Sequence, residues 1–217
     1  MTIHKQRSGA SELLEQVIVP ASTTEALIHV RDYTKGPPHI EANNHPIRHG
    51  HVVGVHNGII VNDDELMEEH GFERAHPEMT VDSEAIFALA EAHGGKAGAL
   101  EQLCGSMATA WIDERHAGTL FLARGVARPL WIGTGRDETL FASTKAALEV
   151  AERYLSLKLR KREIAEGTLV VIRDGEVLDH ARFRPDRDFE ERTLPAFRAP
   201  HEGAFCLQRL AVLAAVA

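Results

Sequence analysis

The 217-residue sequence contains very little cysteine, with Cys104 and Cys206 as the only two. Two thiols cannot build a disulfide framework or a four-thiolate metal site. This composition suits a reducing compartment, so we expect a cytoplasmic protein.

Long hydrophobic runs are also lacking. Residues 2–16 contain no continuous apolar stretch of the kind found in a signal peptide. The apolar C-terminal run, residues 204–217, is interrupted by Gln208 and Arg209 and is shorter than the ~20 residues that span a bilayer. We therefore expect no membrane partner, and a short packed helix or interface segment at this end.

An excess of basic residues is missing as well, because the formal net charge is −8. Binding to nucleic acid depends on a concentrated basic surface, so no nucleic-acid partner is expected. The one basic cluster, residues 158–162, is interpreted as a solvated face. The chain has no internal repeat, no low-complexity tract and no long linker. We expect one domain over residues 1–217, with residues 185–217 as a candidate C-terminal appendage.

The fold class follows from the order of the expected elements. Antiparallel meanders follow an initial pair of helices, which favours an α+β fold over a doubly wound parallel sheet. Asp174-Gly175 is typical of a type I′ hairpin turn, and Ser143 or Thr144 of a helix N-cap. Helices are expected at 63–69, 83–92 and 145–154, and strands at 26–31, 51–55, 106–112, 119–123, 129–132, 139–142, 168–172 and 177–183.

Three stretches carry residues that can do chemistry. The stretch HVRDYTKG (residues 29–36) delivers Arg31 at the end of a strand-like segment, where a guanidinium can hold a carboxylate. Asn57-Gly58 interrupts an apolar run and, taken alone, is a strong hairpin signal. Asp82 begins an amphipathic helix, either as a plain capping acid or as an anionic partner for a ligand ammonium.

In order and spacing these segments resemble the class II glutamine amidotransferase domain, an N-terminal-nucleophile hydrolase module. The resemblance runs from about Ile28 to about Gly175. It implies an αββα sandwich of two antiparallel sheets flanked by helices. It is carried by HVRDYTKG, NNHP, VGVHNGIIVNDDEL, VDSEAIFAL, LCGSMATAWID, LFLARGVARPLWIG and LFASTKAAL.

The resemblance implies roles for the matching residues and no cofactor. Arg31 would bind the α-carboxylate of L-glutamine and Asp82 its α-ammonium. Asn57, through its side-chain amide, and Gly58, through its backbone N–H, would form the oxyanion hole. Thr34 and His56 are also assigned to substrate binding.

The family's nucleophile is a cysteine at the mature N-terminus, and no cysteine precedes Cys104 here. In relatives the nucleophile precedes the motif of Arg31 by roughly twice the number of residues that precede this motif here. We therefore expect this sequence to lack the first part of the domain. Thr2, if exposed, is a chemically competent substitute, but the spacing displaces it. Cys104 and Cys206 are more readily interpreted as core residues.

Six histidines between residues 29 and 56 raise the alternative of a metal site, but their spacing matches no zinc pattern. Two departures from the family pattern, Asp32 and Lys35, suggest an altered pocket. A carboxylate at Asp32 would compete for the guanidinium of Arg31.

The leading hypothesis is a glutamine-binding amidotransferase domain that, complete with an N-terminal cysteine, hydrolyses the glutamine amide to ammonia. The alternative is a pseudoenzyme that serves as a binding or assembly protein. Expected partners are L-glutamine and either a synthase or acceptor-domain protein or a chain that supplies the missing segment.

Overall fold

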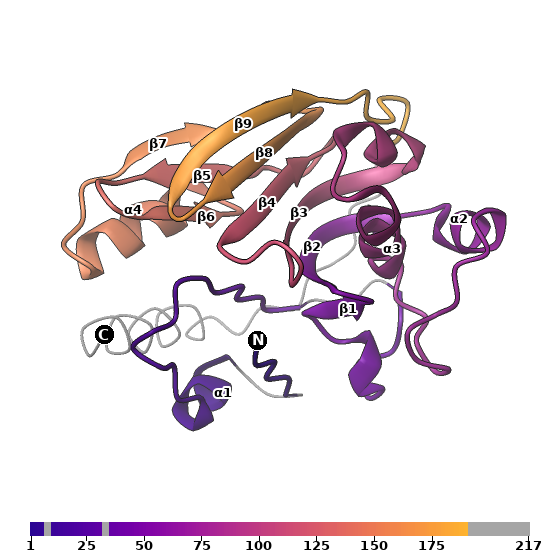
Figure 1. Ribbon diagram of the computed structural model, residues 1–217, viewed down its shortest axis with the longest axis horizontal. Coiled ribbons are helices and arrows are strands. Elements are labelled where there is room, and N and C mark those ends of the chain that lie inside the picture. Colours follow the sequence, from indigo (N-terminus) through magenta and orange to yellow (C-terminus); the bar gives the residue numbers. More distant parts are fainter. Residues whose placement is uncertain (7–9, 32–34, 191–217) are drawn as a thin grey trace.

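Two antiparallel sheets form the body of the chain in the computed structural model, which describes residues 1–6, 10–31 and 35–190 (Figure 1). The larger sheet has the strand order β1-β2-β3-β4-β8-β9 and the smaller sheet the order β6-β5-β7. The strands are β1 (Ile47–His49), β2 (Val52–Ile60), β3 (Gly105–Asp113), β4 (Thr119–Arg124), β5 (Trp131–Thr134), β6 (Thr139–Ala142), β7 (Arg160–Glu163), β8 (Thr168–Arg173) and β9 (Glu176–Arg182).

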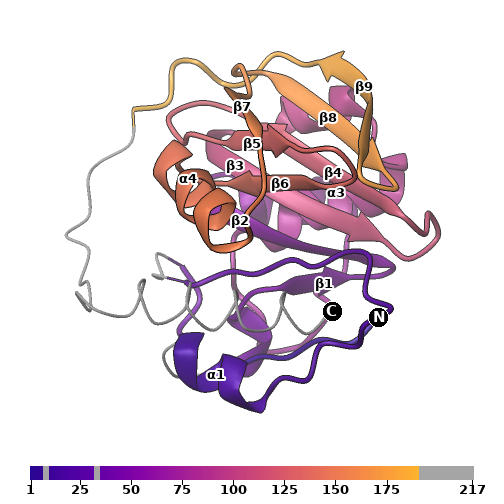
Figure 2. The same cartoon turned by 90° about the vertical axis from the view of Figure 1, so that its left-hand side faces the viewer.

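Helices cover the outer faces of the two sheets. Helix α3 packs on β1 and β2, and α4 packs on all three strands of the smaller sheet (Figures 1 and 2). The order of layers is therefore helix, sheet, sheet, helix, which confirms the expected αββα architecture. The helices are α1 (Ala10–Gln16), α2 (Asp63–Glu69), α3 (Glu84–His93) and α4 (Lys145–Tyr154), with 3-10 turns η1 (Glu41–Asn43) and η2 (Ala97–Gln102).

The two faces of the larger sheet belong to different hydrophobic clusters, because side chains alternate along a strand. Met107 and Trp111 of β3 join Phe87 of α3 in the cluster under the helices. Ala108 and Ala110 of the same strand join the cluster between the sheets. The larger sheet therefore presents one face to the helical side of the molecule, which includes α3, and the other face to the smaller sheet.

Several local predictions are confirmed. Helices α2 and α4 occupy the expected residues, and the hydroxyl oxygen of Thr144 accepts a hydrogen bond from the backbone N–H of Ala147 at 3.2 Å, as an N-cap does. The β8–β9 hairpin turns at Asp174-Gly175 with φ of 49° and 82°, as a type I′ turn requires.

Two predictions about strands are wrong, and one strand was not predicted. Residues 26–31 form no strand, because no backbone hydrogen bond links them to another described strand. Asn57-Gly58 is not a hairpin turn, since the strand expected to stop at residue 55 continues to Ile60. Residues 160–163 of the basic cluster form β7, which is largely exposed but pairs with β5 at the edge of the smaller sheet.

Within the described residues, no helix is long and apolar enough to cross a membrane. The helix or interface segment expected at residues 204–217 lies outside the described residues, as do Cys206 and most of the appendage expected at 185–217.

Candidate functional site

Asn57 and Gly58 lie in the middle of β2, fully paired with β3. Gly58 has a φ of 147°, and a Cβ placed there would lie 2.0 Å from the carbonyl oxygen of Ser106. Glycine is therefore required by both the backbone conformation and the space. Asn57 alternates in phase with Val55, which places its side chain on the face that looks toward the smaller sheet.

Asp82 precedes α3 and is 2% exposed. Its Oδ2 accepts a hydrogen bond of 2.7 Å from the backbone N–H of Ile60, two residues after Gly58. This bond ties the predicted ammonium acceptor to the strand that carries the predicted oxyanion hole. No ion pair joins Asp82 to a cation in the described part of the chain.

Neighbouring buried acids are paired differently. Glu84, which is 0% exposed, is bound by Arg74 at 3.2 Å and by His49 at 3.0 Å. Asp63, which is 1% exposed, is bound by Arg74 at 3.1 Å. Burying a charge is costly unless a partner compensates it, so Asp82 differs from these acids in lacking a cationic partner among the described residues.

His56 lies next to Asn57 and is 4% exposed. Its Nδ1 lies 2.9 Å from the hydroxyl oxygen of Ser83, and its Nε2 lies 3.1 Å from the carbonyl oxygen of Ser106. Ser83 is itself only 2% exposed, so this serine–histidine pair is closed to a substrate carbonyl. The ring joins β2 to the residue that follows Asp82.

The guanidinium of Arg31 is held by a turn. It donates to the side-chain oxygen of Asn44 at 3.3 Å, to the carbonyl oxygen of Gly36 at 3.1 Å and to that of Lys35. Of the other expected site residues, Thr34 lies outside the described residues, as does Asp32, the acid expected to compete for Arg31.

Asn43, a residue for which the sequence motifs imply no role, links this turn to the segment of Asp82. It is fully buried, and its Oδ1 accepts hydrogen bonds from the backbone N–H groups of Thr80 at 2.7 Å and Val81 at 3.1 Å. A Cβ on Gly36 would lie 3.1 Å from the Cα of Val81. The turn that holds Arg31 therefore packs directly against the residue before Asp82.

Lys35, a departure from the family pattern, strengthens this arrangement. Its Nζ lies 2.7 Å from Asp63 and 2.8 Å from Asp64, both in the first turn of α2. The ion pairs anchor the turn that holds Arg31 to the helix that follows β2. In the sequence, only the two consecutive acids Asp63 and Asp64 could have indicated a partner for Lys35.

The rings of His29 and His45 are in contact, with centroids 4.4 Å apart and an interplanar angle of 48°. Burial, with the nearby His56 and Arg31, lowers the pKa of His29 to about 4. Burial, together with the nearby His29, His56, Arg31 and Lys5, lowers the pKa of His45 well below its usual value. Both ring nitrogens of His45 are buried and have no hydrogen-bond partner among the described residues. Among the described residues, no group of three histidine, cysteine or acidic side chains is arranged to hold a metal ion.

Cys104 is partly buried just before β3. Burial raises the pKa of its thiol, and the carboxylates of Asp186 and Glu65 raise it further. A raised pKa disfavours the thiolate, which is the nucleophilic form. Cys104 is therefore not the core residue that was expected, because it is only partly buried, but its neutral thiol is a poor nucleophile.

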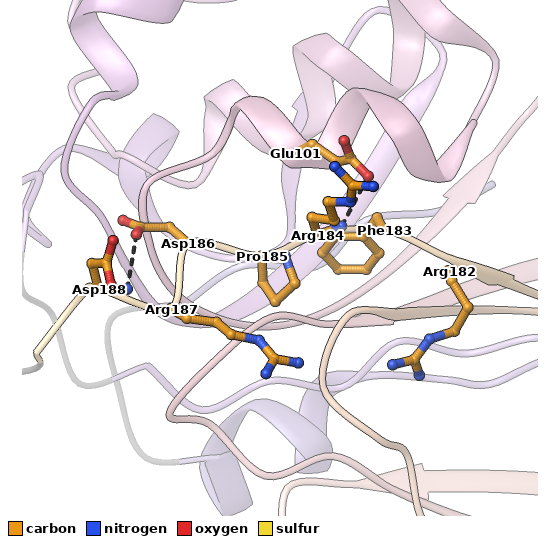
Figure 3. Close-up of a pocket in the computed structure, with 8 residues that line it drawn as sticks. All are labelled: Glu101, Arg182, Phe183, Arg184, Pro185, Asp186, Arg187 and Asp188. Atoms are coloured by element: carbon orange, nitrogen blue, oxygen red, sulfur yellow. Dashed lines mark hydrogen bonds between the residues drawn. The ribbon is translucent and has the colours of Figure 1, made fainter.

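A cleft of about 640 Å³ lies away from these residues, between η2 and the segment after β9 (Figure 3). The backbone N–H of Arg184 donates to Glu101 at 2.9 Å, and that of Asp188 to Asp186 at 3.1 Å. None of the described site residues lines it. Its lining is Glu101, Arg182, Phe183, Arg184, Pro185, Asp186, Arg187 and Asp188.

Comparison with known proteins gives a family for this fold. Residues 34–150 match the family described as glutamine amidotransferase domain. The chain is 35% identical over 174 residues to the glutamine–fructose-6-phosphate aminotransferase (isomerizing) of Shigella flexneri and 34% identical to that of Escherichia coli K12, covering 75% of this chain and 28% of each relative. The enzyme of the same name from Bacillus spizizenii is 28% identical over 210 residues, covering 90% of this chain and 35% of the relative. The chain thus spans about a third or less of the length of these relatives.

Solved structures support the same fold. The glutamine phosphoribosylpyrophosphate amidotransferase of Bacillus subtilis aligns with a TM-score of 0.56 and 22% identity, over 71% of this chain and 34% of that chain. A structure described as the allosteric regulatory enzyme of purine biosynthesis aligns with a TM-score of 0.53 and 22% identity, over 65% and 31%. Since the family match covers more than half of the sequence, the chain belongs to the class II glutamine amidotransferase domains, which have the N-terminal-nucleophile hydrolase fold.

Proposed function

We propose that this chain binds L-glutamine at the corner formed by β2, the N-terminal end of α3 and the turn after Arg31. The observation that carries the proposal is the buried carboxylate of Asp82, which has a backbone N–H as its partner but no cation among the described residues. The α-ammonium of an amino acid supplies the missing positive charge. Arg31 takes the α-carboxylate, and Thr34 is a further proposed binding residue. His56, which the family resemblance also assigned to substrate binding, is only 4% exposed, so we place it behind the site and not in contact with the ligand.

The proposed chemistry is hydrolysis of the glutamine side-chain amide in a form that also carries an N-terminal cysteine. A thiolate attacks the carboxamide carbon, and the resulting oxyanion is held by the Asn57 amide and the Gly58 N–H. The C–N bond then breaks, ammonia leaves after taking up a proton, and water opens the glutamyl thioester to glutamate. An acceptor or synthase protein is the proposed destination of the ammonia.

For the 217-residue chain itself we propose binding without turnover. The environment of Cys104 favours the neutral thiol, and Ser83 is buried beneath His56, so no activated nucleophile is present at the site in the described residues. This supports the second candidate function, a binding or assembly protein built on the same domain. Ammonia release from L-glutamine, compared with an Arg31→Ala variant, tests it: turnover above that control refutes the proposal.

Calorimetric titration tests the binding proposal. Wild-type protein should bind L-glutamine more tightly than glutaramate, the analogue that lacks the α-ammonium. Asp82→Asn should remove this preference and weaken glutamine binding by about 30-fold or more, as expected when a buried charge loses its partner. Asp113→Asn is the matched control, since Asp113 is also 2% exposed but is paired with Arg115 at the far end of β3. Equal binding of the two ligands by the wild type would contradict the assignment of Asp82.

A further inference from the structure

The ring of His56 is buried between Ser83, the residue after Asp82, and Ser106 of β3. It projects from β2 on the side opposite Asn57, because consecutive side chains alternate along a strand. Its two nitrogens contact Ser83, next to Asp82, and Ser106, on the neighbouring strand β3. With an exposed fraction of 4%, it is not open to a ligand.

The contacts determine which nitrogen of His56 carries the proton. The carbonyl oxygen of Ser106 can only accept a hydrogen bond, so Nε2 must be the donor. In a neutral imidazole Nδ1 is then an acceptor, and the hydroxyl of Ser83 must donate to it. Of the two neutral tautomers, only the Nε2–H form satisfies both contacts.

The same residues close a ring of hydrogen bonds around Gly58. The hydroxyl oxygen of Ser106 accepts from the backbone N–H of Ile59 at 3.1 Å, while its carbonyl oxygen accepts from His56. The next N–H, of Ile60, donates to Asp82 at 2.7 Å. Ser83 follows Asp82 in the chain, and its hydrogen bond to the Nδ1 of His56 completes the ring.

We propose that His56 is a positioning residue that holds Asp82 in a fixed place relative to Asn57 and Gly58, and that it acts through this tautomer without contacting the ligand. The inference rests on the proposed function, because Asp82 is taken as the acceptor of the α-ammonium. The hydroxyl of Ser83 orients the start of α3, and the Nε2–H of His56 fixes this orientation relative to β3.

The central variant is Ser83→Ala, which removes the hydroxyl donor and leaves the Nδ1 of His56 without its partner. It should weaken L-glutamine binding about tenfold, the effect of one lost buried hydrogen bond. Glutaramate, which has no α-ammonium, should bind unchanged. A general loss of structure would weaken both ligands alike, so the pair of ligands separates positioning from stability.

Thr109→Val is the matched control. Thr109 is 1% exposed, lies opposite His56 on β3 and donates its own buried hydrogen bond to the carbonyl oxygen of Val55. Its replacement should lower stability to a similar degree and leave glutamine affinity unchanged. His56→Gln, which loses the acceptor for Ser83, should resemble Ser83→Ala, and the double variant should be no worse than either single one.

Nuclear magnetic resonance gives a readout that does not depend on glutamine. A long-range nitrogen–proton correlation spectrum of the His56 ring should show a protonated Nε2 and an unprotonated Nδ1. In Ser83→Ala the backbone N–H of Ile60 should exchange with solvent faster than in the wild type, and in Thr109→Val it should not.

A ring protonated at Nδ1, or an unchanged exchange rate at Ile60 in Ser83→Ala, overturns the proposal. An equal loss of affinity for glutamine and glutaramate overturns it as well. If wild-type protein binds no glutamine, the proposed function fails, while the tautomer and the exchange rate still decide whether His56 holds Asp82 in place.

Discussion

Replacement of Gly58 by alanine should destabilise the chain far more than a typical surface change. A Cβ at this position would lie 2.0 Å from the carbonyl oxygen of Ser106 and 2.7 Å from the Nε2 of His56. The backbone φ of 147° adds strain of about 1–3 kcal/mol for a residue with a side chain. Forcing an extra methyl group into a packed region costs about 1–3 kcal/mol more.

The expected loss is therefore about 2–6 kcal/mol, a large part of the ~5–15 kcal/mol that holds a typical domain together. Urea denaturation followed by circular dichroism measures it as a fall in the transition midpoint. Gly71→Ala is the control, because Gly71 also has a positive φ, of 63°, but has no atom within 4 Å of a built Cβ. The control should lose only about 1–2 kcal/mol. Equal losses for the two variants would refute the argument that β2 and β3 leave no room at Gly58.

Three further measurements follow. His29 has a pKa of about 4 in the folded chain and the ordinary, higher value in the unfolded chain, so its contribution to stability is present at neutral pH and is lost as the pH falls. Between pH 7.5 and pH 5 the free energy of unfolding of the wild type should fall by about 2 kcal/mol more than that of His29→Gln. Equal losses would argue against the buried neutral ring. Phe87→Ala should cost about 3–5 kcal/mol in urea denaturation, because this ring of α3 is fully buried against Gly54 of β2; a cost below about 1 kcal/mol would contradict that packing. Lys35→Met should cost less than about 1 kcal/mol of stability, because the Lys35 side chain is 37% exposed, and the control Lys145→Met should cost equally little. Only Lys35→Met should also weaken glutamine binding. Unchanged binding would disprove the proposed link from Asp63 through Lys35 to Arg31.

The sequence predicted those helices and turns whose formation depends on a few neighbouring residues. Helix α4 has a threonine cap and the β8–β9 turn has residues that accept positive φ, so both could be identified from a few neighbouring residues. Strand β7 could not, because four charged residues in a row carry no alternation, and the strand exists only as an edge partner of β5. Residues 26–31 show the converse, since a strand-like pattern forms no strand without a partner.

In the site, too, local motifs predicted some residues, while contacts between residues distant in the sequence were not predicted. The motifs led to Arg31 and Asp82, and the structure packs the turn that holds Arg31 against the residue before Asp82. Asn57-Gly58 was misread as a turn because the dipeptide favours positive φ in any context, while here the close approach of β3 requires the glycine. The ring of contacts through His56 joins residues 27 and 50 positions apart, and no local pattern reports such contacts.

The central claim is that L-glutamine binds at the corner of β2 and α3, and chemical-shift mapping of the backbone amides tests it most directly. Titration of L-glutamine into nitrogen-15-labelled protein should shift the signals of Gly58, Ile60 and Asp82 in a saturable manner and leave those of the cleft at Glu101 unchanged. Shifts confined to the cleft, or no shifts at all, would contradict the account.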